Sequence, residues 1–516
     1  MSLNPEVLLI NAFSNPYDNA IATARTCYSS KIVNPAEVSR DEKSSIQRDT
    51  IGKSTYLAGH HTIYQHATFQ FAIERISRHC IWSFLHSHPF YNSEQVSQRY
   101  VHVSPGNFAI PPLHAKPREI YVHAIQMLME AYDKLQYMLK DKVEKEYLNI
   151  FCSRNLQEKR WQIEIKKKCQ ETARYVLPLA TYAHLYHTIS GLTLLRYLRI
   201  CELFDVPSEQ KNLVFKMADQ VNQWDPNFLK FAEDTLPLIK TPEFLFYNQF
   251  NSDLSYATSD FISEFDSSLG GYSSLLVDYQ PRSEICMADA VRGVLGITKK
   301  QLGDSEAIDL VMNPAKNCYL SETLNLSSYS KLNRTMNHPH FTFKRKISHT
   351  ADSQDQRHRT IPASRPILSK HLTKKPDYIV PTLIKSCSVA EEYYSKIMDQ
   401  LWIEIDKLIN SGCDIEHVLY LLPNAFPIRS IESGSLIDYH HKWTKRLCYN
   451  SQQEIWKTCL EEVQQIKSMF PDIGRHLYPP CCIRRSSEKN PFCPEGKHFC
   501  GVPVWELGLN EFKRII

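Results

Sequence analysis

Residues 8–25, LLINAFSNPYDNAIATAR, have a counterpart 267 positions later in residues 275–292, LLVDYQPRSEICMADAVR. Both stretches begin with a short apolar run, pass through a turn that contains proline, and continue with apolar residues at helical spacing. The order of these features and the total length are the same in both. We therefore predict that the chain contains two copies of one structural unit.

Two further pairs of segments occur in the same order in both halves. Residues 69–77, FQFAIERIS, and 341–348, FTFKRKIS, have the alternating pattern of a strand that leads into a helix. Residues 173–180, ARYVLPLA, correspond to residues 417–425, HVLYLLPNA. Matches this far apart indicate one long duplication rather than a solenoid, because solenoid units are only about 20 to 50 residues long.

A cluster of glycine and serine at residues 267–274, SSLGGYSS, marks the expected boundary between the copies. We predict one domain at residues 1–266 and a second at residues 267–516, which ends in a tail rich in cysteine and histidine. Each half combines short alternating strands with long amphipathic helices, such as the one expected at residues 390–409. The predicted fold class is α+β.

The composition is that of a soluble globular protein, with 43% hydrophobic and 22% charged residues among 516. The formal net charge is only +4, so no strong basic field indicates a nucleic-acid partner, and we expect small molecules as ligands. Residues 1–13 lack the pattern of a secretory signal, and no apolar run approaches the roughly 20 residues that cross a membrane. We expect a cytoplasmic protein without a membrane partner, whose 15 cysteines are mainly reduced.

Each half contains one polar segment suited to binding an anion. In the first half, NSEQVSQRY at residues 92–100 places Ser97 two positions before Arg99, so an extended backbone would point the hydroxyl and the guanidinium the same way. A polar loop in which Ser97 caps a turn explains the same residues. In the second half, DSQDQRHRTIPASRP at residues 352–366 contains three consecutive basic residues, Arg357, His358 and Arg359.

These segments resemble the two parts of the hallmark of the flavin-dependent thymidylate synthases, which is Arg-His-Arg followed by a serine segment that ends in Ser-x-Arg-Tyr. Residues 60–71, HHTIYQHATFQF, resemble the segment that precedes this hallmark, with Gln65 in place of glutamate. The Ala-Arg-x-Val-Leu-Pro segment that follows it is intact at residues 173–178. The resemblance covers most of each half and implies two tandem copies of that family's fold, an antiparallel sheet with long helices.

The two halves have lost different parts of the family pattern. The first half keeps Ser97 and Arg174 but has His-Ser-His at residues 86–88 in the Arg-His-Arg position. The second half keeps Arg-His-Arg and Arg446 but has Leu419 in the position of Arg174. Random decay would strike both copies about equally, so complementary losses indicate an active site composed from both halves. The other altered positions are Cys201, in the position of Arg446, and residues 363–366, ASRP, in place of Ser-x-Arg-Tyr.

The resemblance implies reductive methylation of dUMP to dTMP, with methylenetetrahydrofolate as carbon donor, NADPH as reductant and FAD as cofactor. It assigns FAD binding to His60, Arg357, His358 and Arg359, with Ser190 at one of the family's flavin-contacting positions, and we expect His358 to titrate near neutrality. His441 and Arg196, farther along the two helices, are candidate substitutes for the altered flavin contacts, and a core or solvated role is the alternative for each. It assigns catalysis to Ser97 and Arg446, with Ser97 activating the nucleotide rather than forming a covalent bond, since its motif provides no base. It assigns dUMP binding to Gln95, Ser97, Arg99, Arg174, Gln354 and Arg446.

Family members are homotetramers whose sites lie between subunits, so two duplicated chains are expected to form a homodimer that mimics the tetramer. Two alternatives stay open, because the family's flavin-contacting Asn and Arg are replaced by Ser190 and Leu192 in the first half and by Ser435 and Ile437 in the second. One alternative is a catalytically silent descendant that binds a nucleotide or a protein. The other is flavin-dependent methylation of another pyrimidine nucleotide.

The segment CCIRRSSEKNPFCPEGKHFC, at residues 481–500, contains enough soft ligands for a structural zinc ion. Buried thiols that hold a proline-rich tail are an equally weighted alternative. The candidate ligands are Cys481, Cys482, Cys493, His498 and Cys500.

Overall fold

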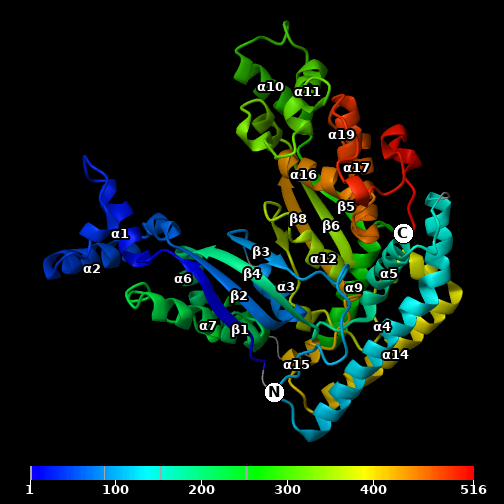
Figure 1. Cartoon of the computed structure of the whole chain (residues 1–516), viewed down its shortest axis with the longest axis horizontal. Coiled ribbons are helices and arrows are strands. Elements are labelled where there is room, and N and C mark those ends of the chain that lie inside the picture. The colour runs from blue at the N-terminus through cyan, green and yellow to red at the C-terminus, as the bar shows by residue number, and fades with distance from the viewer. Residues whose placement is uncertain (1–2, 87, 152–153, 250–253) are drawn as a thin grey trace.

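The computed structural model describes residues 3–86, 88–151, 154–249 and 254–516. Two four-stranded antiparallel sheets, one in each half, form its framework (Figure 1). Their strand orders are β1-β2-β4-β3 and β5-β6-β8-β7, the same arrangement twice, which confirms the prediction of two tandem α+β units. The strands are β1 (Glu6–Ala12), β2 (Thr68–Ser77), β3 (Tyr91–Gln95), β4 (Tyr182–Ser190), β5 (Ser274–Tyr279), β6 (His340–Ser348), β7 (Ala363–Ser364) and β8 (Pro427–Ser435).

Equivalent helices follow equivalent strands in the two halves. Helices α3 and α12 follow β2 and β6, and helices α6 and α16 follow β4 and β8. Up to residue 249 the helices are α1 (Pro16–Thr26), α2 (Glu42–Leu57), α3 (Arg78–Leu85), α4 (Ala115–Ile150), α5 (Lys159–Ala173), α6 (Gly191–Ile200), α7 (Ser208–Trp224) and α8 (Pro242–Gln249). From residue 254 they are α9 (Leu254–Ser268), α10 (Ser283–Leu295), α11 (Asp304–Met312), α12 (His349–Asp355), α13 (Thr382–Lys385), α14 (Ser388–Asn410), α15 (Ile415–Leu419), α16 (Leu436–Arg446), α17 (Gln453–Met469), α18 (Pro471–Gly474) and α19 (Pro480–Ser486).

The irregularities of the edge strands repeat as well. The register of β1 against β2 shifts between Leu9 and Asn11, and that of β5 against β6 shifts between Leu276 and Asp278, the same positions after an offset of 267. Strand β2 has one further bulge, where Arg75 adopts a φ of 54°, and β6 pairs with β8 without this break. The extra residue in β2 explains why the first copy of this strand segment is one residue longer than the second.

In both halves a serine ends the second strand and begins a helix. The Oγ atoms of Ser77 and Ser348 accept hydrogen bonds from the amides three residues later, at 3.0 and 3.1 Å. Each serine in turn donates its hydroxyl to a glutamate of a later helix, Ser77 to buried Glu209 in α7 and Ser348 to half-buried Glu454 in α17. The local signal for the helix start and a long-range contact therefore coincide in both copies.

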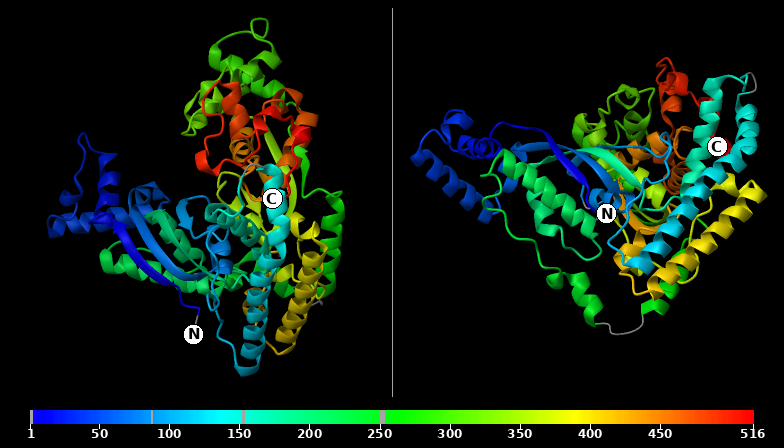
Figure 2. Two further views of the ribbon diagram at one scale, coloured as in Figure 1. Left: turned by 45° about the vertical axis from the view of Figure 1, so that its right-hand side comes forward. Right: turned by 60° about the horizontal axis from the view of Figure 1, so that its bottom comes forward.

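One hydrophobic core is shared by the two halves. Helices α4 and α14 lie side by side in each view (Figures 1 and 2) and form much of this core together with α5. Their buried residues recur at helical spacing, for example Leu128 and Leu135 on α4, and Leu401 and Ile405 on α14. The helix expected at residues 390–409 is the central part of α14. Its apolar face stabilises the pairing of the two copies by removing that surface from water.

A near-two-fold axis passes through the bridge between Pro178 and Pro423. On either side of it, the residue after each proline donates its amide hydrogen to the carbonyl of the residue before the other proline, at 2.8 Å. The tyrosine side chains of these segments are exchanged in the same way: Tyr175 donates its hydroxyl to Glu454, and Tyr420 donates to Glu209 at 3.0 Å. Each half therefore supplies a buried hydroxyl to a glutamate of the other half.

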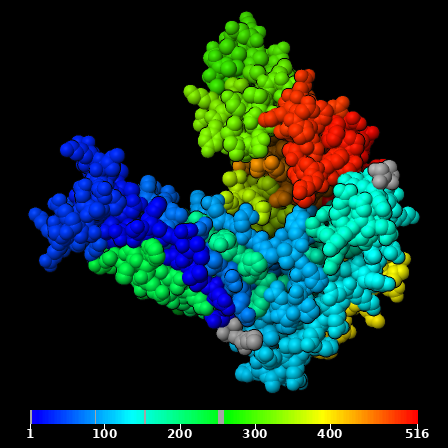
Figure 3. Space-filling view, viewed as in Figure 1, coloured from blue at the N-terminus to red at the C-terminus, as the bar shows by residue number. Residues whose placement is uncertain are grey.

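Helical arms project from both sheets, and the surface between them is open in the space-filling view (Figure 3). Helices α1 and α2 belong to the arm of the first half, and α10 and α11 to the arm of the second (Figure 1). Helix α9 contacts the second sheet, where Asp266 pairs with Arg429 at 2.8 Å and with Lys346 at 2.6 Å. None of the helices in the described part of the chain combines the length and apolar character needed to cross a membrane.

Candidate active site

A cavity open to solvent on one side lies where the loop after β3 meets helix α12. Segments from both halves line it, and all six residues that the resemblance assigned to the nucleotide are among them. From the first half these are Gln95, Ser97, Arg99 and Arg174; from the second they are Gln354 and Arg446. We call this the composite cavity.

The segment that carries Ser97 is a turn, not the extended strand that would point Ser97 and Arg99 the same way. Ser97 Oγ accepts a hydrogen bond from the Arg99 amide at 3.2 Å, and the Ser97 carbonyl accepts from Tyr100 and Val101. Ser97 therefore caps the turn and lines the cavity at once. The alternative interpretation, a capping serine, describes the backbone correctly.

Arg174 is a buried cation with unpaired donors beside the composite cavity. The residue is 5% exposed, and its Nε and Nη2 atoms have no hydrogen-bond partner among the described residues. Burial lowers the pKa of Arg174, as does the neighbouring Arg99, while Glu171 opposes both. Because unpaired buried donors are costly, an anion bound here would satisfy them.

Arg99 is held by contacts from both halves. Its Nη2 atom donates to the Asn450 carbonyl at 2.8 Å and lies 3.0 Å from a carboxylate oxygen of Glu171. Gln98, beside it, accepts a hydrogen bond from the Asn424 amide at 3.0 Å, and Asn424 also donates to the Arg174 carbonyl at 2.9 Å. The sequence analysis missed Gln98 and Asn424, because their function depends on the contact between the halves.

Arg446 closes the cavity from the second half. Its Nε atom donates to His358 Nε2 at 2.9 Å, and its Nη2 atom donates to the Gln354 carbonyl at 2.9 Å. Burial and the adjacent Arg446 lower the pKa of His358 well below its usual value. The expectation that His358 titrates near neutrality is therefore wrong: it is a half-buried, neutral acceptor for Arg446.

The flanking arginines of this motif lie against the first sheet. Arg357 pairs with Glu94 at 2.9 Å, and Arg359 donates to Asn92 Oδ1 at 3.1 Å while its guanidinium lies over the Tyr91 ring at 5.0 Å. These contacts border a second cavity, which shares Gln95 and Arg357 with the composite cavity. Its other lining residues include Gln70, Tyr91, Tyr186, Thr188 and Arg359.

Four residues assigned to FAD line neither cavity: His358, described above, and the three that follow here. His60 is exposed before the short helix at His61–His66 in the first arm. Ser190 caps α6, where its Oγ atom accepts from the Thr193 amide at 3.3 Å. His441 bonds Asn325 at 3.1 Å, and its ring lies 5.8 Å from that of His358. The structure does not bring these three residues together.

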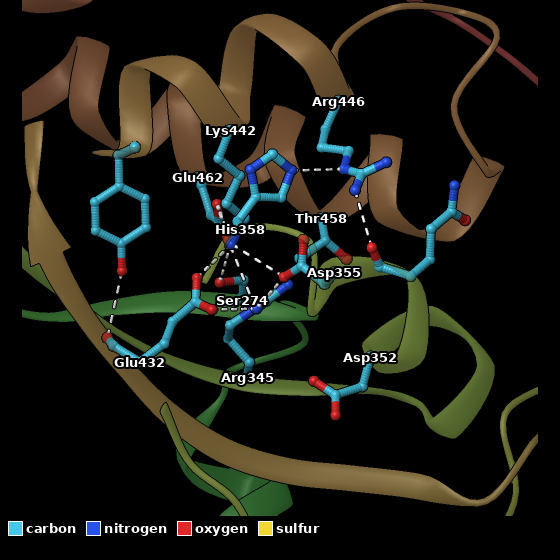
Figure 4. Close-up of polar contacts among 12 residues, drawn as sticks. Ser274, Arg345, Asp352, Asp355, His358, Glu432, Lys442, Arg446, Thr458 and Glu462 are labelled. Carbon is cyan, nitrogen blue, oxygen red and sulfur yellow. Dashed lines mark hydrogen bonds and ion pairs between the residues drawn. The ribbon is translucent and has the colours of Figure 1, made fainter. Parts of the chain in front are cut away.

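A cluster of buried charged side chains lies next to the Arg-His-Arg loop (Figure 4). Arg345 and Lys442 both contact Glu432, Asp355 and Glu462; Arg345 Nη1 lies 2.7 Å from Asp355, and Lys442 Nζ lies 3.3 Å from it. Asp355 is the last residue of α12 and so connects this cluster to the loop that follows. Because all five side chains are buried, removing one charge would leave others uncompensated.

The first half has an aromatic cluster at the corresponding place. His187 pairs with Phe71 in the first sheet, as Glu432 pairs with Phe343 in the second. The ring of His187 lies 4.9 Å from that of Phe84 and 6.0 Å from that of Tyr197. Among the residues that the structure describes, the charged cluster is therefore found only in the half that keeps the Arg-His-Arg motif.

The position related by the near-two-fold axis to the composite cavity is filled by side chains. Counted from Ser77 and Ser348, Trp82 corresponds to Ser353 and His86 to Arg357. Trp82 Nε1 donates to Asp352 at 2.7 Å, Arg365 makes a bidentate contact with the same carboxylate at 2.8 and 3.0 Å, and His86 lies 3.5 Å from it. Burial lowers the pKa of His86 to about 4. Ser87, between His86 and His88, lies outside the described residues.

The cysteine-rich segment needs a correction. Cys481, Cys493 and Cys500 line one cavity, together with Cys448, which the sequence analysis missed. Cys482 is buried with its Sγ directed to the Val504 carbonyl, and neither it nor His498 lines that cavity. Within the described ranges, no three His, Cys, Asp or Glu side chains are placed to hold a metal ion. The predicted zinc ligands are therefore not assembled.

Comparison with known protein families gives two matches along the chain. The Thy1 model, described as thymidylate synthase complementing protein, matches residues 8–227 and again residues 275–472. Each half thus contains one copy of the family domain, and residues 473–516 lie beyond the second match.

Curated relatives each correspond to less than half of the chain. The flavin-dependent thymidylate synthase of Clostridium tetani (strain Massachusetts / E88) is 27% identical over 237 residues, which are 45% of this chain and 88% of the relative. That of Geobacter sulfurreducens is 25% identical over 230 residues, 44% of this chain and 92% of the relative.

Two solved structures are also similar. The UMP/dUMP methylase PolB from Streptomyces cacaoi, bound with 5-Br dUMP, is 14% identical with a TM-score of 0.33, covering 45% of this chain and 95% of PolB. The flavin-dependent thymidylate synthase ThyX from Helicobacter pylori, complexed with FAD and dUMP, is 18% identical with a TM-score of 0.31, covering 45% of this chain and 100% of ThyX.

Proposed function

The chain belongs to the Thy1 family of thymidylate synthase complementing proteins and carries two copies of its domain, and from this premise we propose that it is a flavin-dependent thymidylate synthase. The proposed reaction is the reductive methylation of dUMP to dTMP, with methylenetetrahydrofolate as carbon donor and NADPH as reductant. One active site is composed from the two halves of each chain, and two chains form a homodimer.

The observation that carries this proposal is the composition of the composite cavity. Ser97, Arg99 and Arg174 come from the half that lost Arg-His-Arg, and Gln354 and Arg446 come from the half that lost the serine segment. Each half alone would offer an incomplete set of polar groups. A silent descendant has no need to keep complementary halves of one site, which favours an active enzyme.

The cavity suits a nucleotide monophosphate by charge and by hydrogen bonding. Arg174 offers two unpartnered buried nitrogen atoms, and Arg99 Nε is likewise buried without a partner among the described residues. Planar guanidinium groups can hold a phosphate through paired, charge-assisted hydrogen bonds. The Gln354 Oε1 atom, also buried and unpartnered in the described part of the chain, can accept a hydrogen bond from a base or a ribose.

The neighbouring cavity suits a flavin. Tyr186, which is exposed, offers a flat apolar surface, while Arg357 and Arg359 place positive charge at the edge of this cavity. When bound there, FAD would supply the hydride for the reduction. Arg357 borders both cavities, so it can hold the flavin edge beside the nucleotide.

The purified full-length protein provides the test. We expect an absorption band at roughly 450 nm from bound oxidised flavin, and formation of dTMP from dUMP that requires both methylenetetrahydrofolate and NADPH. Binding of dUMP and FAD without turnover would support the silent alternative instead. Turnover of a different pyrimidine nucleotide, with dUMP inert, would overturn the assignment of the substrate.

A further inference from the structure

Gln98, the residue between Ser97 and Arg99, lines the composite cavity but has no role in the site described so far. The residue is 6% exposed. Its backbone carbonyl accepts a hydrogen bond from Gln170 Nε2 on α5 at 3.2 Å, which ties the turn to a helix of the same half. The backbone of Gln98 is therefore held at the cavity by its own half of the chain.

Asn424, from the second half, determines the direction of the Gln98 side-chain amide. Asn424 is 2% exposed and also lines the cavity. Its Nδ2 atom donates to the Arg174 carbonyl at 2.9 Å and to Gln98 Oε1 at 3.0 Å. Because a backbone carbonyl can only accept, the atom of Asn424 that faces it must be the amide nitrogen, and the partner of that nitrogen on Gln98 must then be the oxygen. The Gln98 Nε2 atom therefore remains available as a donor.

The unpartnered polar atoms that the two halves contribute to the cavity differ in type. Gln98 Nε2 is shielded from solvent and has no hydrogen-bond partner among the described residues, and the same holds for guanidinium nitrogen atoms of Arg78, Arg99 and Arg174. These first-half atoms are donors, whereas Gln354 of the second half contributes an acceptor, Oε1. Unpaired buried donors are costly, and a dianionic phosphate offers acceptor oxygens alone. A phosphate group therefore matches the side of the cavity that the first half supplies.

We propose that Gln98 is a further binding residue for the nucleotide: its Nε2 atom donates a hydrogen bond to a phosphate oxygen of dUMP, and Asn424 is the positioning residue that directs this donor. Burial and the neighbouring Arg99 both lower the pKa of Arg174, so the two guanidinium groups already disfavour one another. A neutral amide adds a hydrogen bond to the phosphate without adding a further positive charge beside them. The inference rests on the proposed function, because it requires dUMP to bind in the composite cavity.

The test uses full-length Gln98→Met, which keeps the approximate length of the side chain and removes its donor. Calorimetry with dUMP and with deoxyuridine, which lacks the phosphate, measures the two parts of the ligand separately. The dissociation constant for dUMP should rise roughly tenfold or more, because a hydrogen bond to a charged group is lost, while that for deoxyuridine should stay within about twofold. KM for dUMP should rise while kcat stays within about twofold. Gln126→Met, at an exposed position on α4, is the matched control and should bind dUMP as the wild type does.

A double-variant cycle tests the role of Asn424. Asn424→Ala should weaken dUMP binding, and it should do so at least threefold less when Gln98→Met is already present, because the donor that Asn424 directs is then gone. Equal losses in the two backgrounds would overturn the positioning role, since they would mean that Asn424 acts through Arg174 or through packing.

Two results would overturn the contact between Gln98 and the phosphate. One is wild-type affinity for dUMP in folded Gln98→Met, and the other is an equal loss of dUMP and deoxyuridine binding. If methionine prevents folding, Gln98→Glu keeps the shape of the side chain and the oxygen that Asn424 binds; it should weaken dUMP binding at least as much, and unchanged affinity would again overturn the proposal. If the wild-type protein does not bind dUMP, the proposed function fails, and this inference fails with it.

Discussion

The indole nitrogen of Trp82, in the first half, donates a hydrogen bond of 2.7 Å to the carboxylate of Asp352 in the second half. Asp352 is 1% exposed and also binds Arg365. Trp82 occupies the position that corresponds to Ser353 in the composite cavity. The duplication therefore has two consequences at the contact between its halves: one cavity is kept, and its counterpart is filled by an ion pair and an indole ring.

The first prediction concerns stoichiometry. Because Trp82, His86 and the pair of Asp352 with Arg365 fill the second position, each chain should bind one dUMP molecule. Titration calorimetry with the active-site fraction determined independently gives this number directly. Two equivalent dUMP sites per chain would contradict the structural assignment.

The second prediction concerns stability. Asp352→Ala should lower the free energy of unfolding by about 3 to 5 kcal/mol, because it leaves buried Arg365 without its partner. Denaturant titration of the variant measures this loss. Asp399→Ala, at an exposed position on α14, is the matched control and should change stability by less than about 0.5 kcal/mol. Similar small effects of both substitutions would mean that the Asp352 contact contributes little.

The pair of Asp352 and Arg365 also predicts how stability changes at low pH. Burial alone would raise the pKa of Asp352, but Arg365 and its hydrogen-bond donors lower it far below the usual range. The folded protein thus binds this proton more weakly than the unfolded chain does. The stabilisation is complete above the unfolded pKa of about 3.9 and is lost as the pH falls below that value.

The third prediction concerns Glu209, whose pKa is raised in the folded protein, whereas that of Asp352 is lowered. Burial raises the pKa of Glu209 to about 7, although Ser77 and Tyr420 donate hydrogen bonds to it. The folded state therefore holds a proton that the unfolded state releases near pH 4 to 5, and stability should fall as the pH rises from about 4.5 to 7. The size of the fall is on the order of 3 kcal/mol. Glu209→Gln, which keeps the size of the side chain, should flatten this part of a stability-against-pH profile; an unchanged slope would assign it to other groups.

The fourth prediction tests the shared site by activity. Arg99→Ala, Arg174→Ala and Arg357→Ala should each abolish NADPH-dependent formation of dTMP, although the three residues come from different halves. For Arg99 and Arg174 the loss includes about 2 kcal/mol or more of dUMP binding, roughly 30-fold. Turnover is measured on folded protein, with circular dichroism as the check.

The positions that correspond to these arginines provide the controls. His86→Ala and Leu419→Ala should keep turnover in the folded fraction, because neither side chain lines the composite cavity. Leu419 is 2% exposed, so its truncation should still cost about 2 to 5 kcal/mol of stability. A His86→Ala variant as inactive as Arg357→Ala would show that the first half uses its own flavin position.

The sequence was sufficient to predict the duplication and the division of the site between the two halves, because matching motifs occur in the same order in both halves. It was misleading for residues whose environment depends on distant partners. Arg345 lies in the run Lys-Arg-Lys and resembles a surface residue of an alternating strand, yet it is 1% exposed. Its partners Asp355, Glu432 and Glu462 lie 10 to 117 positions away, and no local pattern connects them to it.

The histidine of the Arg-His-Arg motif is a similar case. The motif predicts which residues lie near the ligands, but the state of His358 depends on its burial and on Arg446, which belongs to another helix. Likewise, Cys448 precedes the cysteine-rich segment by more than thirty positions and reaches the same cavity only through folding. In these cases the sequence predicted which types of side chain lie near a site. The protonation state of the histidine and the set of cysteines that share one cavity could be read only from the tertiary structure.

The pairing of α4 with α14 also determines when during translation the apolar face of α4 can be buried. Helix α4 ends at Ile150, and α14 begins at Ser388. Ribosomes add about 5 to 20 residues per second, so the face of α4 that packs on α14 waits roughly 10 to 50 s for its partner to be synthesised. During translation this apolar stripe is exposed to chaperones and to neighbouring chains, and the yield of native protein depends on how well it is shielded until the second copy emerges.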